Sequence, residues 1–196
     1  MAKSKALRVA SGLWVGCLLS LLSACSVAPV EPGMRYSRAA MNHLYDVERW
    51  SFDGRLALTG QTDSWSANIS WQHAPELETI KLSGPLGQGA VVISLAGNVV
   101  TIDRGGDDVQ TSTQPEEFIN QQLGMFVPVR SLRYWVVGLP EPSNTYKDAD
   151  AGFNQDGWLN EYKQMQMVND GVMPHKMTVM NDQVKLKLII DRWVLQ

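Results

Sequence analysis

The residue types that commonly carry out chemistry are few in this chain of 196 residues, and they are dispersed. Its three histidines, His43, His73 and His175, share no spacing that would hold a metal ion. A Gly-x-Ser-x-Gly elbow is absent from the sequence, and the glycine-rich run 84–89 lacks the Lys-Ser/Thr ending of a phosphate loop. We therefore expect a protein that is not an enzyme and that needs no metal or other cofactor.

The sequence that surrounds Cys25 predicts a covalent modification of this residue. A basic start and the apolar run 9–22 precede it, and that run is too short for a spanning helix, which needs about 20 residues. The segment Leu22-Ser23-Ala24 then leads into the cysteine. This pattern resembles the bacterial lipobox, in which the cysteine thiol is alkylated with diacylglycerol, the chain is cut before it, and the new amine is acylated. The alternative is an ordinary signal peptide cut near Ala24, with the cysteine incidental.

The lipobox interpretation divides the chain into three segments: a signal peptide at 1–24, an acylated tether at 25–33 and a single domain at 34–196. Ser26 occupies the place where Asp often marks retention in the inner membrane, so an outer-membrane address is expected. The protein would be lipid-anchored there, facing the periplasm. It would contain no disulfide, because Cys17 leaves with the signal and the other cysteine is acylated.

The charge of the mature chain also restricts its partners. Loss of the three basic signal residues takes the formal net charge from −3 to −6. An acidic chain is a poor candidate for nucleic-acid binding and gains nothing from anionic lipid headgroups. Contact with outer-membrane phospholipid beyond the anchor is therefore expected to be apolar.

A period-two pattern dominates the region that must form the framework. Residues 51–58 alternate, and in the run 64–71 the apolar Trp65, Ala67, Ile69 and Trp71 face away from polar neighbours. Such alternation is typical of an antiparallel sheet with one dry face. Further apolar runs indicate strands at 80–83, 91–93, 99–102, 109–112, 158–167, 172–179, 184–190 and 192–194.

Helices and turns interrupt these strands. Helical spacing predicts a helix at 37–49, another from a capping box at 113–116 to Gly124, and a third at 128–137. A polar loop is expected at 141–149. Hairpin turns are predicted at Asp156-Gly157 and Asn169-Asp170-Gly171. The sum is a mainly β fold with a few helices, as a curved antiparallel sheet or an incomplete barrel.

The connection between 80–83 and 91–93 contains an unusual residue. Gly84, Pro85, Gly87 and Gly89 predict a turn, yet its long side chain near the apex is the apolar Leu86. Hairpin tips normally carry polar residues because they stand in water. The leucine either folds back onto the sheet or points outward, toward a membrane.

Three motifs together resemble the LolB family of outer-membrane lipoproteins. They are the tip Pro85-Leu86-Gly87, the run Ser131-Leu132-Arg133-Tyr134-Trp135-Val136-Val137-Gly138-Leu139-Pro140, and the ending Val184-Lys185-Leu186-Lys187-Leu188 followed by Trp193. The resemblance covers nearly the whole mature chain, in order. One departure is Gly84, where relatives are expected to carry Asn, which alters the turn chemistry but not the apolar tip.

The resemblance implies an incomplete antiparallel β-barrel with a helical lid, enclosing an apolar cavity for acyl chains. It implies a monomer that receives triacylated lipoproteins from LolA, the periplasmic carrier, and inserts them into the outer membrane without nucleotide hydrolysis. Pro85, Leu86 and Gly87 would form the membrane-insertion loop. The residues assigned to the acyl-chain cavity are Trp65, Ile69, Trp71, Leu82, Trp135, Met165 and Met177.

The residues alone leave alternatives open. Tryptophan offers wide apolar walls and methionine reshapes at small cost, but both residue types are more often ordinary core. The late methionines fit either use; they are Met165, Met167, Met173, Met177 and Met180. A lipocalin-like lipoprotein that binds a small apolar ligand, or a passive envelope protein, would share the fold but would need neither the leucine tip nor a carrier.

Overall fold

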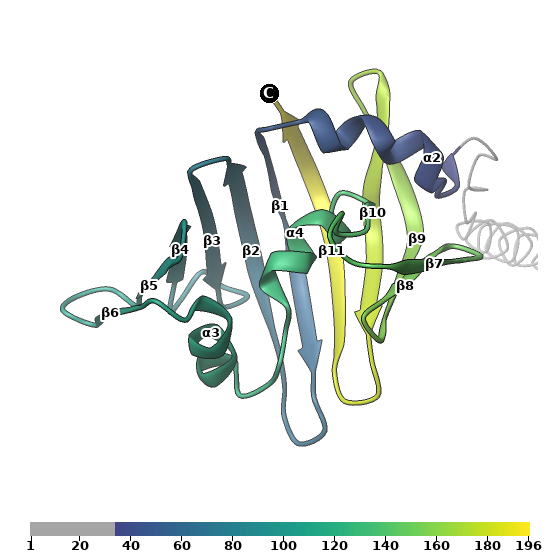
Figure 1. Cartoon of the computed structure of the whole chain (residues 1–196). Helices are drawn as coiled ribbons and strands as arrows, with labels where there is room; N and C mark the ends of the chain where they lie inside the picture. Colours follow the sequence, from purple (N-terminus) through teal and green to yellow (C-terminus); the bar gives the residue numbers. More distant parts are fainter. Residues whose placement is uncertain (1–33) are drawn as a thin grey trace, which may run out of the picture. The chain divides into compact units, whose positions relative to one another are not determined.

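A computed structural model describes residues 34–196 of the protein (Figure 1). The predicted signal peptide 1–24, the tether 25–33 and the lipid-attachment residue Cys25 lie outside the described residues. In the described part, strands predominate and form one antiparallel sheet of 11 strands. The prediction of a mainly β protein with a few helices, built on an open curved sheet, is confirmed.

The sheet is an extended meander with one long interruption. Its strands are β1 (Trp50–Thr59), β2 (Ser64–Ala74), β3 (Leu77–Ser83), β4 (Val91–Ala96), β5 (Val99–Asp103), β6 (Val109–Ser112), β7 (Tyr146–Ala149), β8 (Gly152–Gln155), β9 (Trp158–Val168), β10 (Gly171–Met180) and β11 (Lys185–Leu195). The spatial order is β6-β5-β4-β3-β2-β1-β11-β10-β9-β8-β7. Because β6 and β7 are opposite edges, the chain between them must cross the sheet.

Helices α3 (Pro115–Leu123) and α4 (Val129–Trp135) occupy that crossing segment, and Figure 1 shows both in front of one face of the sheet. Helix α2 (Arg38–Met41) and the 3-10 helix η3 (Asn42–Asp46) lie near one end of the same face, where α2 contacts β10. The helix-covered face is therefore a consequence of strand order, since one edge can be joined to the other only by passing over the sheet.

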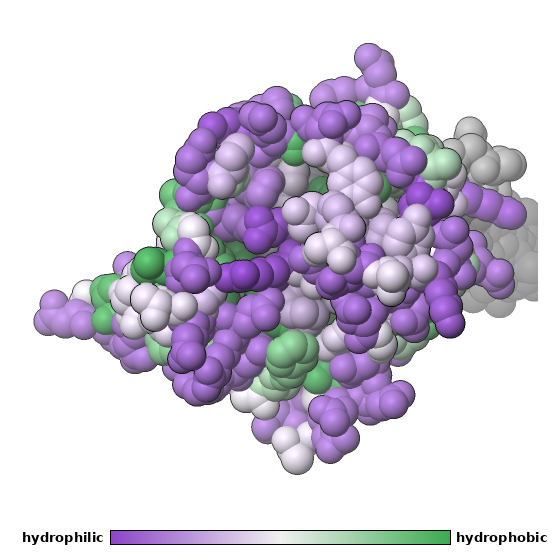
Figure 2. Space-filling model, viewed as in Figure 1, coloured by the Kyte–Doolittle hydropathy of each residue, from purple (hydrophilic) through white to green (hydrophobic). Residues whose placement is uncertain are grey.

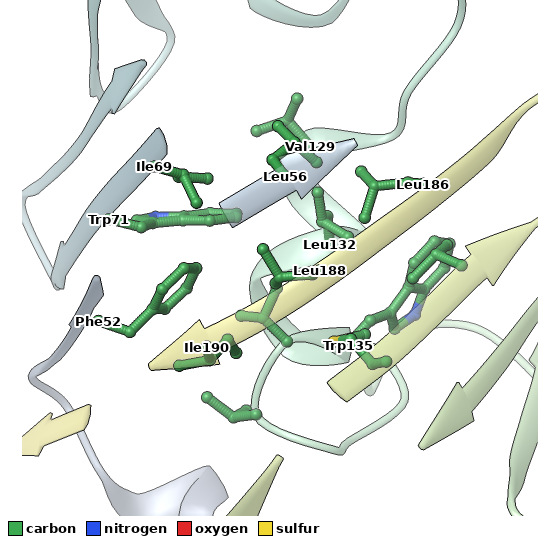
Figure 3. Close-up of a cluster of buried hydrophobic side chains, with 14 of the residues drawn as sticks. Phe52, Leu56, Ile69, Trp71, Val129, Leu132, Trp135, Leu186, Leu188 and Ile190 are labelled. Carbon is green, nitrogen blue, oxygen red and sulfur yellow. The ribbon is translucent and has the colours of Figure 1, made fainter. Parts of the chain in front are cut away.

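The core lies between the sheet and α4. Burial alternates along β1, with Trp50, Phe52, Leu56 and Leu58 turned inward, as the period-two pattern predicts. Figure 3 shows side chains from three sources pointing toward one another. They are Phe52, Leu56, Ile69 and Trp71 from β1 and β2, Leu186, Leu188 and Ile190 from β11, and Val129, Leu132 and Trp135 from α4. Burial of this apolar surface is the main term holding α4 on the sheet.

Three local predictions are wrong in detail. The predicted helix 37–49 changes to 3-10 geometry at Asn42 and ends at Asp46. The capping box does not form: the N-cap of α3 is Gln114, without a side-chain bond, although the helix ends at Gly124 with φ 70° as expected. Residues 146–149, predicted as loop, form β7, because pairing with β8 overrides their polar composition.

Both predicted hairpin turns are present. Asp156 and Gly157 adopt positive φ angles of 52° and 80°, and Asn169 also has a φ of 52°. These left-handed conformations match the right-handed twist of the flanking strands, which is why Asp-Gly and Asn at such positions favour hairpins.

Candidate functional site

An apolar pocket, the inner pocket, lies between the sheet and helices α3 and α4. Its volume is about 50 Å³, and every lining side chain is hydrophobic. The lining residues are Leu56, Leu58, Trp65, Ile69, Trp71, Ile80, Leu82, Ile93, Ile119, Leu123, Val127, Val129, Leu132 and Leu186. The space is close to that of one or two water molecules, each of which occupies about 30 Å³ in the liquid. In this form the helices nearly fill the interior.

A second pocket, the mouth pocket, adjoins the first and has a volume of about 250 Å³. The two pockets share five lining residues: Trp65, Leu82, Ile93, Ile119 and Leu123. The mouth pocket also reaches Gly84 and Gly89 of the β3–β4 loop, and Gln122 of α3. The apolar interior therefore borders a space at the base of that loop.

The β3–β4 loop, residues 84–90, is a tight turn that presents Leu86 to solvent. The backbone N–H of Gly87 donates to the Gly84 carbonyl at 2.8 Å, and that of Gly84 donates to the Gln88 carbonyl at 2.9 Å. Gly87 has a φ of 81°, a conformation that favours glycine. Leu86 is 83% exposed, whereas no other large hydrophobic residue within 34–196 exceeds 59%.

The Leu86 side chain thus takes the outward alternative. An apolar side chain held in water at the tip of a hydrogen-bonded turn forgoes the free energy that its burial would provide. On the helix-covered face, Figure 2 shows mostly hydrophilic residues, with hydrophobic residues in small patches.

The structure brings together four of the seven side chains predicted for the cavity. Trp65 and Leu82 line both pockets, and the buried Ile69 and Trp71 line the inner one. The other three, Trp135, Met165 and Met177, are buried in the core and are not among the lining residues of either pocket. For all seven residues, a role in acyl-chain binding stays a prediction.

Trp135 is a tryptophan of the buried core and does not line either pocket. It is fully buried, its ring lies 6.2 Å from that of Trp158, and its Nε1–H donates to Gln155 Oε1 at 2.8 Å. Its backbone carbonyl accepts a hydrogen bond of 2.7 Å from the Tyr162 hydroxyl. These contacts fix the end of α4 on the sheet.

A buried carboxylate at the other side of α4 was not identified from the sequence. Glu78 is 6% exposed and accepts a hydrogen bond from Trp71 Nε1 at 3.1 Å. Arg133 of α4 forms an ion pair with it at 3.1 Å, and His73 Nδ1 lies 3.7 Å away. Arg133 and Glu78 meet only because the folded chain brings α4 and β3 together, and no local sequence pattern indicates this contact.

Within 34–196, no cluster of three or more His, Cys, Asp and Glu side chains is arranged to hold a metal ion. None of the helices described in that range is long and apolar enough to cross a bilayer.

Comparison with known proteins gives one consistent result. Residues 48–193 match the family model described as outer membrane lipoprotein LolB. An outer-membrane lipoprotein LolB of a Marinomonas species is 32% identical, over 92% of this chain and 97% of that protein. A protein of the same name from Chromohalobacter salexigens is 30% identical, over 93% of this chain and 90% of that protein. Another, from Pseudomonas aeruginosa, is 31% identical, over 76% of each chain.

Proposed function

Because the chain belongs to the LolB family of outer-membrane lipoproteins, we propose that it accepts triacylated lipoproteins from a LolA-like periplasmic carrier and inserts them into the outer membrane. In this proposal Cys25 carries the protein's own lipid anchor, and residues 34–196 work as a monomeric domain on the periplasmic side. The partners are the loaded carrier, the lipoprotein cargo and outer-membrane phospholipid.

The physical task explains why the interior must be apolar. Each methylene group removed from water contributes about 0.8 kcal/mol, so the three acyl chains of a cargo cannot remain exposed. The inner and mouth pockets offer hydrophobic side chains for this purpose. Each transfer step lowers the free energy if this protein binds the chains more tightly than the carrier does, and if the bilayer holds them more tightly than this protein does. No nucleotide hydrolysis is required.

The volumes of the pockets restrict how cargo is bound. Pockets for small ligands have about 300–1,000 Å³, whereas the inner pocket has about 50 Å³. The space between the covering helices and the sheet is therefore too small for three acyl chains. Acyl chains can enter only when at least one of the two covering helices moves away from the sheet.

The observation that carries the proposal is the exposure of Leu86. Transfer of one leucine into lipid contributes about 1.5–3 kcal/mol. This is too little to anchor a protein but sufficient to orient the loop toward the bilayer. A protein that only stored a small apolar ligand would have no use for such a tip.

Leu86→Glu tests the proposal. We expect the variant to fold and to take cargo from a loaded carrier, but to lose insertion, because a carboxylate at the tip cannot enter hydrocarbon. Leu77→Glu is the matched control: Leu77 is also an exposed leucine, 46% accessible, but it lies at the opposite end of β3. Outer-membrane arrival of a labelled lipoprotein is the measurement. Normal delivery by Leu86→Glu would refute the role of the loop and favour the ligand-storage alternative.

A further inference from the structure

Strand β2 has no neighbour on one side over its first residues. Pairing between β2 and β3 begins at Asn68, opposite Ser83, although β2 itself begins at Ser64. The Asn68 side-chain amide donates to the Gly84 carbonyl at 3.1 Å and so marks the point where the sheet divides. Trp65 and Ala67 therefore line the mouth pocket from a stretch of strand that pairs with β1 but not with β3.

Helix α3 closes the other side of this division with few polar contacts. Among the described residues, its side chains make one hydrogen bond to the sheet region, from the Arg104 guanidinium to the Gln122 amide oxygen. Its apolar contacts are made by two buried residues, Pro115 and Ile119, and two partly buried ones, Phe118 and Leu123. Arg104 is additionally paired with Asp108 at 3.4 Å.

Helix α4 is held more firmly. Arg133 pairs with Glu78, and Arg130 donates to Asn98 at 2.9 Å. At the far end, Trp135 donates to Gln155 and receives the bond from Tyr162 described above. Of the two covering helices, α3 is thus the one that leaves the sheet at the smaller cost in broken contacts.

We propose that acyl chains leave the protein through the mouth pocket, between α3 and the start of β2, where β2 has no β3 neighbour. Trp65 is the residue that they pass. The occupant is a fatty acyl chain, because the mouth pocket borders the apolar inner pocket and shares five apolar lining residues with it. The exit opens at the base of the Leu86 loop, so a chain that emerges there meets the bilayer where the loop has entered it. This inference rests on the proposed function.

Ala67→Phe tests the exit, since Ala67 lines the mouth pocket but not the inner one. The probe is a fluorescent triacylated lipoprotein on its periplasmic carrier, added to the full acylated protein in phosphatidylethanolamine–phosphatidylglycerol vesicles. We expect uptake to be retained and release into the vesicles to slow by about tenfold or more, because the added ring would occupy the pocket through which the acyl chain leaves. Ser66→Phe is the control: Ser66 is the exposed neighbour on the opposite face of β2.

Gln122→Ala is the second variant, and we expect it to change the release rate in the opposite direction. Removing the amide that Arg104 contacts should speed release by a few-fold, and it places no bulk in the interior, so the test stands even if Ala67→Phe misfolds. Release by folded Ala67→Phe at the wild-type rate, or combined loss of uptake and release, would overturn the exit. Slower release by Gln122→Ala would do the same. Failure of the wild-type protein to take cargo would instead refute the proposed function.

Discussion

Single side chains set two different properties of this protein. Leu86 is exposed because a hydrogen-bonded turn leaves it no apolar surface to cover, and this exposure underlies the proposed function. Tyr162 is the opposite case. It is a buried phenol whose hydroxyl donates to the Trp135 carbonyl at 2.7 Å, and its ring stacks on Tyr36 at 4.2 Å. It contributes to stability rather than to transfer.

Burial raises the pKa of Tyr162 well above 10.0, because the phenolate would lose its hydration. The unfolded chain releases this proton near pH 10, whereas the folded chain retains it. The associated stability is therefore fully present below about pH 10 and is lost as the pH rises further. Tyr162→Phe should reduce this alkaline loss.

At neutral pH the same variant should cost about 0.5–1.5 kcal/mol, since one hydrogen bond is lost while the Trp135 carbonyl keeps its bond from the Gly138 N–H. Urea unfolding between neutral and strongly alkaline pH measures both effects. An alkaline slope identical to that of the wild type would contradict the assignment to Tyr162.

Among the elements, the two covering helices differ in what holds them. Helix α4 carries the cation that faces the buried Glu78 carboxylate. Arg133→Met leaves that carboxylate without its nearest full positive charge, so we expect a loss of about 1–3 kcal/mol in unfolding free energy. Arg130→Met on the same helix is the control: its exposed bond to Asn98 should matter by no more than about 0.5 kcal/mol.

A double-mutant cycle with Glu78→Gln isolates the pair. The glutamine oxygen can still accept the Trp71 Nε1–H, so the second substitution removes the charge but not that bond. Residues in direct contact commonly couple by about 0.5–3 kcal/mol. Additive effects of Arg133→Met and Glu78→Gln on chemical denaturation would show that the ion pair does not fix α4.

Over the whole described domain, stability should follow the strand order. Strands β1 and β11 lie at the centre of the sheet and join its two halves, whereas β6 and β7 are edges. Amide hydrogen exchange is expected to be slowest in β1 and β11 and fastest in β6 and β7. Helix α3 should exchange faster than α4. Faster exchange of α4 would contradict the proposed exit, because it would make α4 the more easily displaced cover.

Several features follow from local sequence. Alternation along residues 51–58 places Phe52 and Leu56 on a dry face, and Asp156-Gly157 forms its turn, because strand faces and tight turns depend on neighbouring residues alone. The family was also recognisable from short motifs. The apolar tip was visible in the same way, although its outward direction was not.

The tertiary structure alone decided which apolar side chains border a space. Trp65 and Trp135 both lie in apolar patterns, yet Trp65 lines two pockets while Trp135 is enclosed by Trp158 and Gln155. The same holds for Arg133, which meets Glu78 only because α4 crosses the sheet. Contacts of this kind join residues far apart in the chain, and strand order, not local pattern, brings them together.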